Sequence, residues 1–226
     1  MCADVIHLGF FDWRNPNSLA ARIRQRRNEL FGSMIAGLGR PLTILDVGGL
    51  PGVWERLNLV NQPGIRITLL NTSDIRHQCQ TGYNNVDYLV GDARDMSVFR
   101  DGYFDVIYSN SVIEHVGGAT ERLQMASEIR RVAKRYFVQT PYRYFPVEPH
   151  FVFPFFQFMP TKMQVHLVRN HNLGWFKRTP DRVDAERAVR SIELLSKREF
   201  RRLFPDGTLA SERFCGLVKS MLAYRM

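Results

Sequence analysis

The sequence predicts an α/β fold in which helices cover both faces of a mostly parallel, seven-stranded sheet. Short apolar runs that fit buried strands alternate along the chain with helical patterns. The last two strand-like runs are joined by only two residues, which suits an antiparallel hairpin. With 226 residues, of which 45% are hydrophobic, the chain is expected to form one domain with a sizeable core.

The expected elements follow one another in a regular order. A first helix has apolar residues at helical spacing, namely Leu19, Ile23, Leu30, Met34, Ile35 and Leu38, and Asn17 or Ser18 before it suits an N-cap. The strand-like runs are 42–47, 65–70, 86–90, 106–108 and 136–139, and further helices are expected at 53–59 and 120–134. A helix at 197–203 and the strand pair 208–214 and 217–224 complete the pattern.

The charge is strongly positive. The chain has 31 Lys and Arg against 22 Asp and Glu, a formal net charge of +9, which favours nucleic acid, acidic membrane surfaces or anionic small molecules as partners. Two groups of cations lie within helical patterns, namely Arg22, Arg24, Arg26 and Arg27, and Lys197, Arg198, Arg201 and Arg202. We expect both groups to be solvated helix faces, and a dedicated anion-binding surface is the alternative.

Cysteine usage and hydropathy limit the class of protein. The three cysteines are far apart and form no Cys-x-x-Cys pair, so we expect neither a disulfide framework nor a metal site, and a reducing cytoplasm fits best. The first residues contain no sustained apolar stretch that would suit a secretory signal. The most apolar run, 151–159, is interrupted by Pro154 and is too short to span a bilayer, so membrane insertion is not expected.

The strongest motif is the segment 44–52, in which a strand-like run leads into a glycine-rich turn before a helix. Glycines allow positive φ angles and a close approach of the backbone to a ligand, and a helix N-terminus offers free N–H groups to a carboxylate. A nicotinamide-binding turn would need glycine where Leu50 and Val53 stand, so its spacing fails. A glycine-rich turn without a ligand is the remaining alternative.

This segment resembles the first motif of class I S-adenosylmethionine-dependent methyltransferases, Asp-x-Gly-Cys-Gly-x-Gly. The stretch 103–115 resembles the fourth strand and the following turn of their methyltransferase-11 group. The resemblance implies a Rossmann-like methyltransferase fold and S-adenosyl-L-methionine as cofactor. Asp46 would then lie near the methionine amino group, and Gly48, Gly49 and Gly52 would shape the turn. Leu50 replaces the middle glycine of the family; at a positive φ it would cost about 1–2 kcal/mol. We therefore expect that Gly49 takes the strained position or that cofactor binding is weaker.

The resemblance extends to the ribose-binding position after the second strand. Asn71 and Thr72 stand there, 25 positions or more beyond Asp46, where the family places an acidic residue. An amide lacks the charge that strengthens hydrogen bonds to hydroxyl groups, so weaker ribose binding is expected. Asp74 would supply the carboxylate if the strand ended later.

Two further turns complete the cofactor site that the resemblance implies. Asp92 and Ala93 are similar to the adenine-binding turn, although a Gly-Asp pair is also ordinary turn chemistry. Ser109 and Asn110 end the fourth strand, and ligands of open parallel sheets bind at that edge.

The stretch 139–150 resembles the signature Thr-Pro-Asn-Arg-x-Phe-Pro-x-Glu-x-His of one branch of these enzymes, with Tyr142 in place of Asn. We hypothesise that His150, positioned by Glu148, is the base that deprotonates a methyl acceptor. His115, after the fourth strand, is equally a second base or a packed residue. In the alternative interpretation Glu148 pairs with Arg143 and His150 merely ends a loop.

Several residues are expected to contact the acceptor, namely Tyr142, Arg143, Tyr144, Phe151, Phe10 and Trp13. The phenylalanines at 145, 151, 153, 155, 156 and 158 are dense for a surface connection and are expected to form part of an apolar wall or lid, with core packing as the alternative.

The resemblance divides the single domain, 1–226, into a helical cap (1–40), a cofactor-binding core (42–140), an acceptor-side loop or lid (141–183) and a C-terminal helix and hairpin (184–226). The expected function is methylation of a small-molecule acceptor in cytoplasmic biosynthesis, with oxygen favoured over nitrogen or carbon. An RNA methyltransferase is one rival. The positive charge favours it, whereas Ser-Asn-Ser-Val at 109–112 in place of the Asn-Pro-Pro-Tyr-like motif counts against it. A non-catalytic relative remains the second rival. No pattern identifies the acceptor or the oligomeric state.

Overall fold

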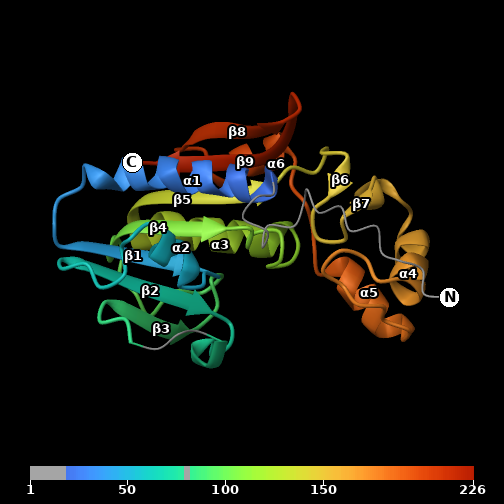
Figure 1. The fold of residues 1–226 in the computed structure, drawn as a ribbon, viewed down its shortest axis with the longest axis horizontal. Coiled ribbons are helices and arrows are strands. Elements are labelled where there is room, and N and C mark those ends of the chain that lie inside the picture. Colours follow the sequence, from blue (N-terminus) through green and yellow to red (C-terminus); the bar gives the residue numbers. More distant parts are fainter. Residues whose placement is uncertain (1–18, 79–81) are drawn as a thin grey trace.

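A seven-stranded sheet forms the centre of the molecule in the computed structural model, which describes residues 19–78 and 82–226 (Figure 1). Phe10 and Trp13, expected at the acceptor site, lie outside these ranges. The strand order is β3-β2-β1-β4-β5-β9-β8. The strands are β1 (Leu42–Val47), β2 (Ile65–Asn71), β3 (Val86–Val90), β4 (Phe104–Asn110), β5 (Ala133–Pro141), β8 (Thr208–Phe214) and β9 (Leu217–Arg225). Strands β1 to β5 run parallel, whereas β9 is antiparallel to both β5 and β8.

Helices cover both faces of this sheet, as expected. The helices are α1 (Leu19–Ala36), α2 (Gly52–Arg56), α3 (Ala119–Val132), α4 (Thr161–Asn170), α5 (Arg182–Arg190) and α6 (Lys197–Leu203), with 3₁₀ turns η2 (Arg76–Gln78) and η3 (Phe156–Phe158). Side chains of α1 and α2 pack on one face, and side chains of α3 and α6 pack on the other. Within the two described ranges, no helix has the length and apolar character needed to cross a membrane.

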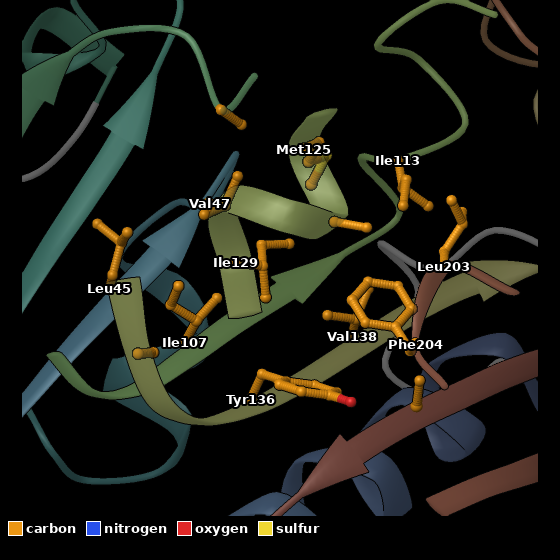
Figure 2. Packing of buried hydrophobic residues seen from close by; sticks show 14 of the residues in the cluster. Leu45, Val47, Ile107, Ile113, Met125, Ile129, Tyr136, Val138, Leu203 and Phe204 are labelled. Carbon is orange, nitrogen blue, oxygen red and sulfur yellow. The ribbon is translucent and has the colours of Figure 1, made fainter. Parts of the chain in front are cut away.

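The strands read as continuous apolar runs because both of their faces are buried. In β1, Leu42 and Ile44 pack under α1 and α2, whereas Leu45 and Val47 pack under α3. These side chains form two hydrophobic clusters, one on each face of the sheet. Figure 2 shows the cluster on the α3 face, where strand side chains meet Ile129 and other residues of α3. Full burial of such a side chain contributes about 1.5–3 kcal/mol, so the two clusters fix the register of the sheet.

The boundaries of some elements differ from the prediction for local reasons. The helix expected at 120–134 ends at Val132, because Ala133 is extended (φ −131°, ψ 147°) and starts β5. The helix expected at 53–59 ends at Arg56 and is followed by Asn58 at φ 54°. In α1, Leu30 was predicted to lie on the apolar face of the helix, but its side chain is 38% exposed.

The closing hairpin is confirmed, including its two-residue link. Cys215 (φ 47°) and Gly216 (φ 80°) both have positive φ angles, which is the conformation that a type I′ turn requires. The paired strands β8 and β9 lie at the edge of the sheet beside β5.

The segment 141–183, expected as an acceptor-side loop or lid, contains helix α4. Together with α5, which follows it, this segment belongs to a lobe that we define as residues 142–196. Helices α4 and α5 pack around Phe151 and Phe156 in a cluster separate from the sheet core, and the short strands β6 (Val147–Glu148) and β7 (Phe153–Pro154) belong to the lobe. The segment expected as a loop or lid therefore contains regular structure. Figure 1 shows the lobe beside the sheet.

The prediction that the cations at 22, 24, 26 and 27 form a solvated helix face is wrong for one of them. Arg27 is buried and pairs with Glu212 of β8, with Nε to Oε1 at 2.9 Å and Nη2 to Oε2 at 2.6 Å. The cations at 197, 198, 201 and 202 are exposed, as expected.

Candidate active site

The glycine-rich turn lies where the strand order reverses, between β1 and β4, which is where open parallel sheets bind ligands. Gly48 has φ +73°, and a Cβ there would lie 2.5 Å from a methyl carbon of Val112. A Cβ on Gly49 would lie 1.7 Å from Oδ2 of Asp46, so the turn wraps closely around this carboxylate. Gly48, and not Gly49, therefore takes the positive φ. Leu50 avoids that conformation and is 47% exposed, so the expected strain at Leu50 is absent.

Asp46 and Ser109 place polar atoms at this edge that have room for a ligand's hydrogen bonds. Asp46 is buried, and its Oδ2 accepts a hydrogen bond from Nε1 of Trp54 at 2.8 Å. Oδ1 of Asp46 and Oγ of Ser109 have no hydrogen-bond partner within the described part of the chain. Burial raises the pKa of Asp46 to about 7, against the opposing effect of the Trp54 hydrogen bond. A buried acceptor without a partner costs about 1–3 kcal/mol, so this edge fits a ligand that brings donors, such as an amino group.

Asn71 ends β2, as predicted, but its amide nitrogen donates to the carbonyl oxygen of Gly49 at 3.0 Å. Asn71 therefore holds the glycine turn, and only its amide oxygen remains for a hydroxyl group. Thr72 follows it and is exposed. Asp74 was expected to supply the ribose-binding carboxylate only if the strand ended later, but β2 ends at Asn71. The carboxylate of Asp74 binds Arg76 instead, and this hydrogen bond lowers the pKa of Asp74 to about 2.

Asp92 and Ala93 form a turn directly after β3. The carboxylate of Asp92 accepts hydrogen bonds from the backbone N–H of Arg94 at 2.8 Å and from its guanidinium at 2.5 Å. These bonds lower the pKa of Asp92. Ala93 is buried against the sheet core.

Asn110, the last residue of β4, is engaged by α1. Its amide oxygen accepts a hydrogen bond from Nη1 of Arg27, the buried cation of α1. Burial lowers the pKa of Arg27, but the charge and the hydrogen bonds of Glu212 outweigh this, so the net pKa is raised. This three-residue link between α1, β4 and β8 had no signal in the sequence.

Glu148 and His150 make the contact that the signature predicted. Oε1 of Glu148 accepts from Nδ1 of His150 at 2.7 Å, and Oε2 accepts from the backbone N–H groups of His150 at 2.7 Å and Phe151 at 2.6 Å. The alternative pairing of Glu148 with Arg143 is wrong, since Arg143 binds Glu199 at 3.1 Å. Burial lowers the pKa of His150, but Glu148 outweighs it and the net pKa is raised.

His150 belongs to a larger cluster that joins two strand ends. Its Nε2 lies 4.0 Å from Oε1 of Glu114, and its ring meets that of His115 edge-on, with centroids 4.8 Å apart. Glu114 is buried, its Oε2 accepts from Thr140 at 3.0 Å, and its Oε1 has no partner among the described residues. Burial raises the pKa of Glu114 to about 7. The donor atoms of Glu114, His115 and His150 lie within 4.8 Å of one another, which makes this group a candidate for metal binding.

The ring of His115 contacts the backbone of Ser191. Its Nδ1 lies 3.2 Å from the carbonyl oxygen of Ser191, and burial of the ring, with His150 nearby, lowers the pKa of His115.

A cavity of about 390 Å³ adjoins this cluster at Glu148. Phe151 and Arg143, both expected at the acceptor site, line it together with Phe156 and Gln157. Tyr144 instead is 56% exposed and stacks on Phe158. Tyr142 lies under the ammonium group of Lys197, 5.7 Å from its ring centroid.

Comparison with known proteins agrees with this geometry. Residues 45–136 match the model of a family described as a methyltransferase domain, the methyltransferase-11 type. The search of curated proteins finds no match.

Among solved structures, a SAM-dependent methyltransferase from Methanosarcina mazei is 15% identical and superposes with a TM-score of 0.53, covering 86% of this chain and 97% of that one. PH0226 protein from Pyrococcus horikoshii is 20% identical and superposes with a TM-score of 0.53, and the match covers 93% of this chain and 92% of that one. A putative methyltransferase from Haloferax volcanii, solved with the Trm112 methyltransferase activator, is 15% identical and superposes with a TM-score of 0.52. The match covers 95% of this chain and 96% of that one. These likenesses show a shared fold. Residues 45–136 are therefore a methyltransferase domain of the methyltransferase-11 type within a Rossmann-like methyltransferase fold, and S-adenosylmethionine is the cofactor that such a domain uses.

Proposed function

We propose that the chain methylates an oxygen atom of a small-molecule acceptor, and that His150 takes the proton from the acceptor hydroxyl. The observation that carries this proposal is the orientation of His150. Its Nδ1 is anchored on Glu148 at 2.7 Å, which leaves Nε2 directed toward the space shared with Glu114 and His115. A histidine held in one orientation by a carboxylate is the arrangement that a general base requires.

The cofactor side of the proposed reaction rests on the edge between β1 and β4. Asp46 and Ser109 supply acceptor atoms there, and Gly48 and Gly49 keep the turn free of side chains. When bound, S-adenosylmethionine supplies a methyl carbon attached to a positively charged sulfur. The protein's own task is then to align the acceptor oxygen with that carbon and to exclude water.

The cavity beside Glu148 supports a small acceptor with both apolar and polar parts. Its volume of about 390 Å³ is in the range of small-molecule sites. Phe151 and Phe156 offer an apolar wall, while Arg122, Arg143 and Gln157 offer hydrogen-bonding groups. The aromatic segment of the sequence therefore contributes to the proposed acceptor wall through these two phenylalanines, while Phe155 and Phe158 are exposed.

Calorimetric titration with S-adenosylmethionine tests the cofactor part. We expect binding at micromolar concentration, whereas a non-catalytic relative with the same fold need not bind. Absence of binding would overturn the proposal.

The acceptor part is tested with S-adenosylmethionine that carries an isotope label on its methyl group, incubated with a panel of hydroxylated small molecules. We expect label on oxygen, and a loss of about a hundredfold or more in rate for His150→Ala. His171→Ala is the matched control, because His171 is exposed at the end of α4 and belongs to neither site. Label found only on nitrogen or carbon, or an unchanged rate for His150→Ala, would contradict the proposal.

A further inference from the structure

We propose that Glu114, His115 and His150 form a binding site for one divalent transition-metal ion. The ligand atoms would be Oε1 of Glu114 and Nε2 of both histidines. The inference rests on the proposed function only for what the ion does to the acceptor, since the site itself follows from the geometry of these three side chains.

The three donors converge without a rearrangement of the backbone. They lie within 4.8 Å of one another, and the distance from Nε2 of His150 to Oε1 of Glu114 is 4.0 Å. Two ligand atoms that are each about 2.0–2.2 Å from one ion lie about 3–4 Å apart. Side-chain movements of roughly 1 Å would therefore complete the site.

Both histidines already have the outer contacts that metal-binding histidines use. The Nδ1 of His115 faces the carbonyl oxygen of Ser191, which only accepts, so this nitrogen carries the proton and Nε2 presents a lone pair. The Nδ1 of His150 donates to Glu148, which also accepts two backbone N–H groups, so Nε2 of His150 is likewise left for a ligand. Such partners of the distal ring nitrogen orient the imidazole and increase its basicity.

Glu114 provides an independent sign that the site binds a cation. Its side chain is fully buried and Thr140 binds only Oε2. Oε1 accepts no hydrogen bond in the described ranges, and Nε2 of His150 lies 4.0 Å from it. A buried carboxylate oxygen without a partner is costly. A cation among Glu114, His115 and His150 would supply the partner.

The donor set indicates the kind of metal. Two imidazoles and one carboxylate suit Zn²⁺, Fe²⁺, Co²⁺ or Mn²⁺ better than Mg²⁺ or Ca²⁺, which prefer oxygen ligands only. Three protein ligands leave positions open for water and for the acceptor oxygen.

The ion deepens the proposed function by changing how the acceptor is activated. An acceptor hydroxyl bound to the cation loses its proton to solvent more readily, because the cation stabilises the negative charge on oxygen. In the ion-free protein Nε2 of His150 takes the proton, as proposed above. With the ion bound, Nε2 is a ligand, the cation lowers the pKa of the acceptor hydroxyl, and the proton passes to solvent.

The test uses the full chain, first treated with a chelator and then titrated with Co²⁺, read by calorimetry and by visible absorption. We expect one equivalent to bind, and Glu114→Gln or His115→Ala to weaken binding at least tenfold. Glu148→Gln, which removes only an outer contact, is expected to weaken it about 10- to 100-fold. His171→Ala is the control and is expected to bind as the parent does. Circular dichroism checks that each variant is folded.

No binding of Co²⁺, or binding that Glu114→Gln and His115→Ala leave unchanged, would overturn the site, the latter because the ion then sits on other histidines. Methyl transfer that continues unchanged after chelation and still depends on His150 would overturn the role of the ion and leave the proposed function standing. Binding of Co²⁺ by a protein that methylates no hydroxyl would support the site and count against the proposed function.

Discussion

Removal of the buried charge of Asp46 should change the pH dependence of folding in a defined direction. Burial raises the pKa of this carboxyl from 3.8 to about 7. Between these two values the unfolded chain releases the proton while the folded chain keeps it, so stability falls as the pH rises. The full contribution is present below pH 3.8 and is lost once the pH exceeds about 7.

The magnitude follows from the gap between the two pKa values. Each pH unit in that window corresponds to about 1.4 kcal/mol. Raising the pH from 5 to 8 should therefore destabilise the cofactor-free protein by about 3 kcal/mol through Asp46 alone. In Asp46→Asn this loss disappears, because the amide does not titrate and can still accept the hydrogen bond of Trp54.

Urea unfolding of the parent and of Asp46→Asn at pH 5, 6, 7 and 8 measures this effect. Other titrating groups, such as Glu114, act equally in both proteins, so the difference between the two unfolding free energies isolates Asp46. We expect Asp46→Asn to gain about 3 kcal/mol on the parent across this range. A difference that stays constant with pH would refute the reasoning.

Three further changes test the packing around the sheet. Arg27→Met leaves the largely buried carboxylate of Glu212 without its guanidinium partner and with only the hydroxyl of Ser220 donating to it. The change should cost about 3–5 kcal/mol in urea unfolding, and the double variant with Glu212→Leu should recover most of the loss. Gly49→Ala forces a Cβ to within 1.7 Å of the carboxylate beneath the turn, so its melting temperature should fall, whereas Gly37→Ala, with no atom within 4 Å, should unfold like the parent. Phe156→Ala removes a buried ring of the lobe and should cost about 3–5 kcal/mol, with faster hydrogen exchange in α4 and α5 but not in β1; equal exchange throughout would argue against a separate lobe core.

The sheet was predictable because its strands are buried on both faces. A run such as 42–47 has no exposed face that would require polar residues, and so it stands out in the sequence. The hairpin was equally clear, since a link as short as Cys215-Gly216 permits only an antiparallel return.

The lobe could not be predicted in the same way. Helices α4 and α5 have only 10 and 9 residues, and their buried positions face a small cluster of their own. Short helices of this kind depend on tertiary packing more than on their own propensity, so the local pattern was weak.

The same contrast holds for the candidate site. The contact between Glu148 and His150 spans two residues and was predictable from the signature. The contact of Arg27 with Glu212 spans 185 residues, and no local pattern reports it. The approach of Glu114 to His150 lies between these cases, since adjacent parallel strands bring their ends together but do not fix the side-chain distances.

The two ends of the lobe are paired with each other, and this makes the lobe an exchangeable unit. Tyr142 and Leu195 form an isolated parallel bridge, and the N–H of Arg143 donates to the carbonyl of Leu195 at 3.0 Å, so the chain leaves and re-enters the sheet region at one point. Changes to the segment between Arg143 and Leu195 should therefore leave the end of β5 and the start of α6 in place. Under the proposed function, selectivity for a new acceptor can therefore evolve, or be engineered, within the lobe while the sheet edge proposed to bind the methyl donor stays unchanged.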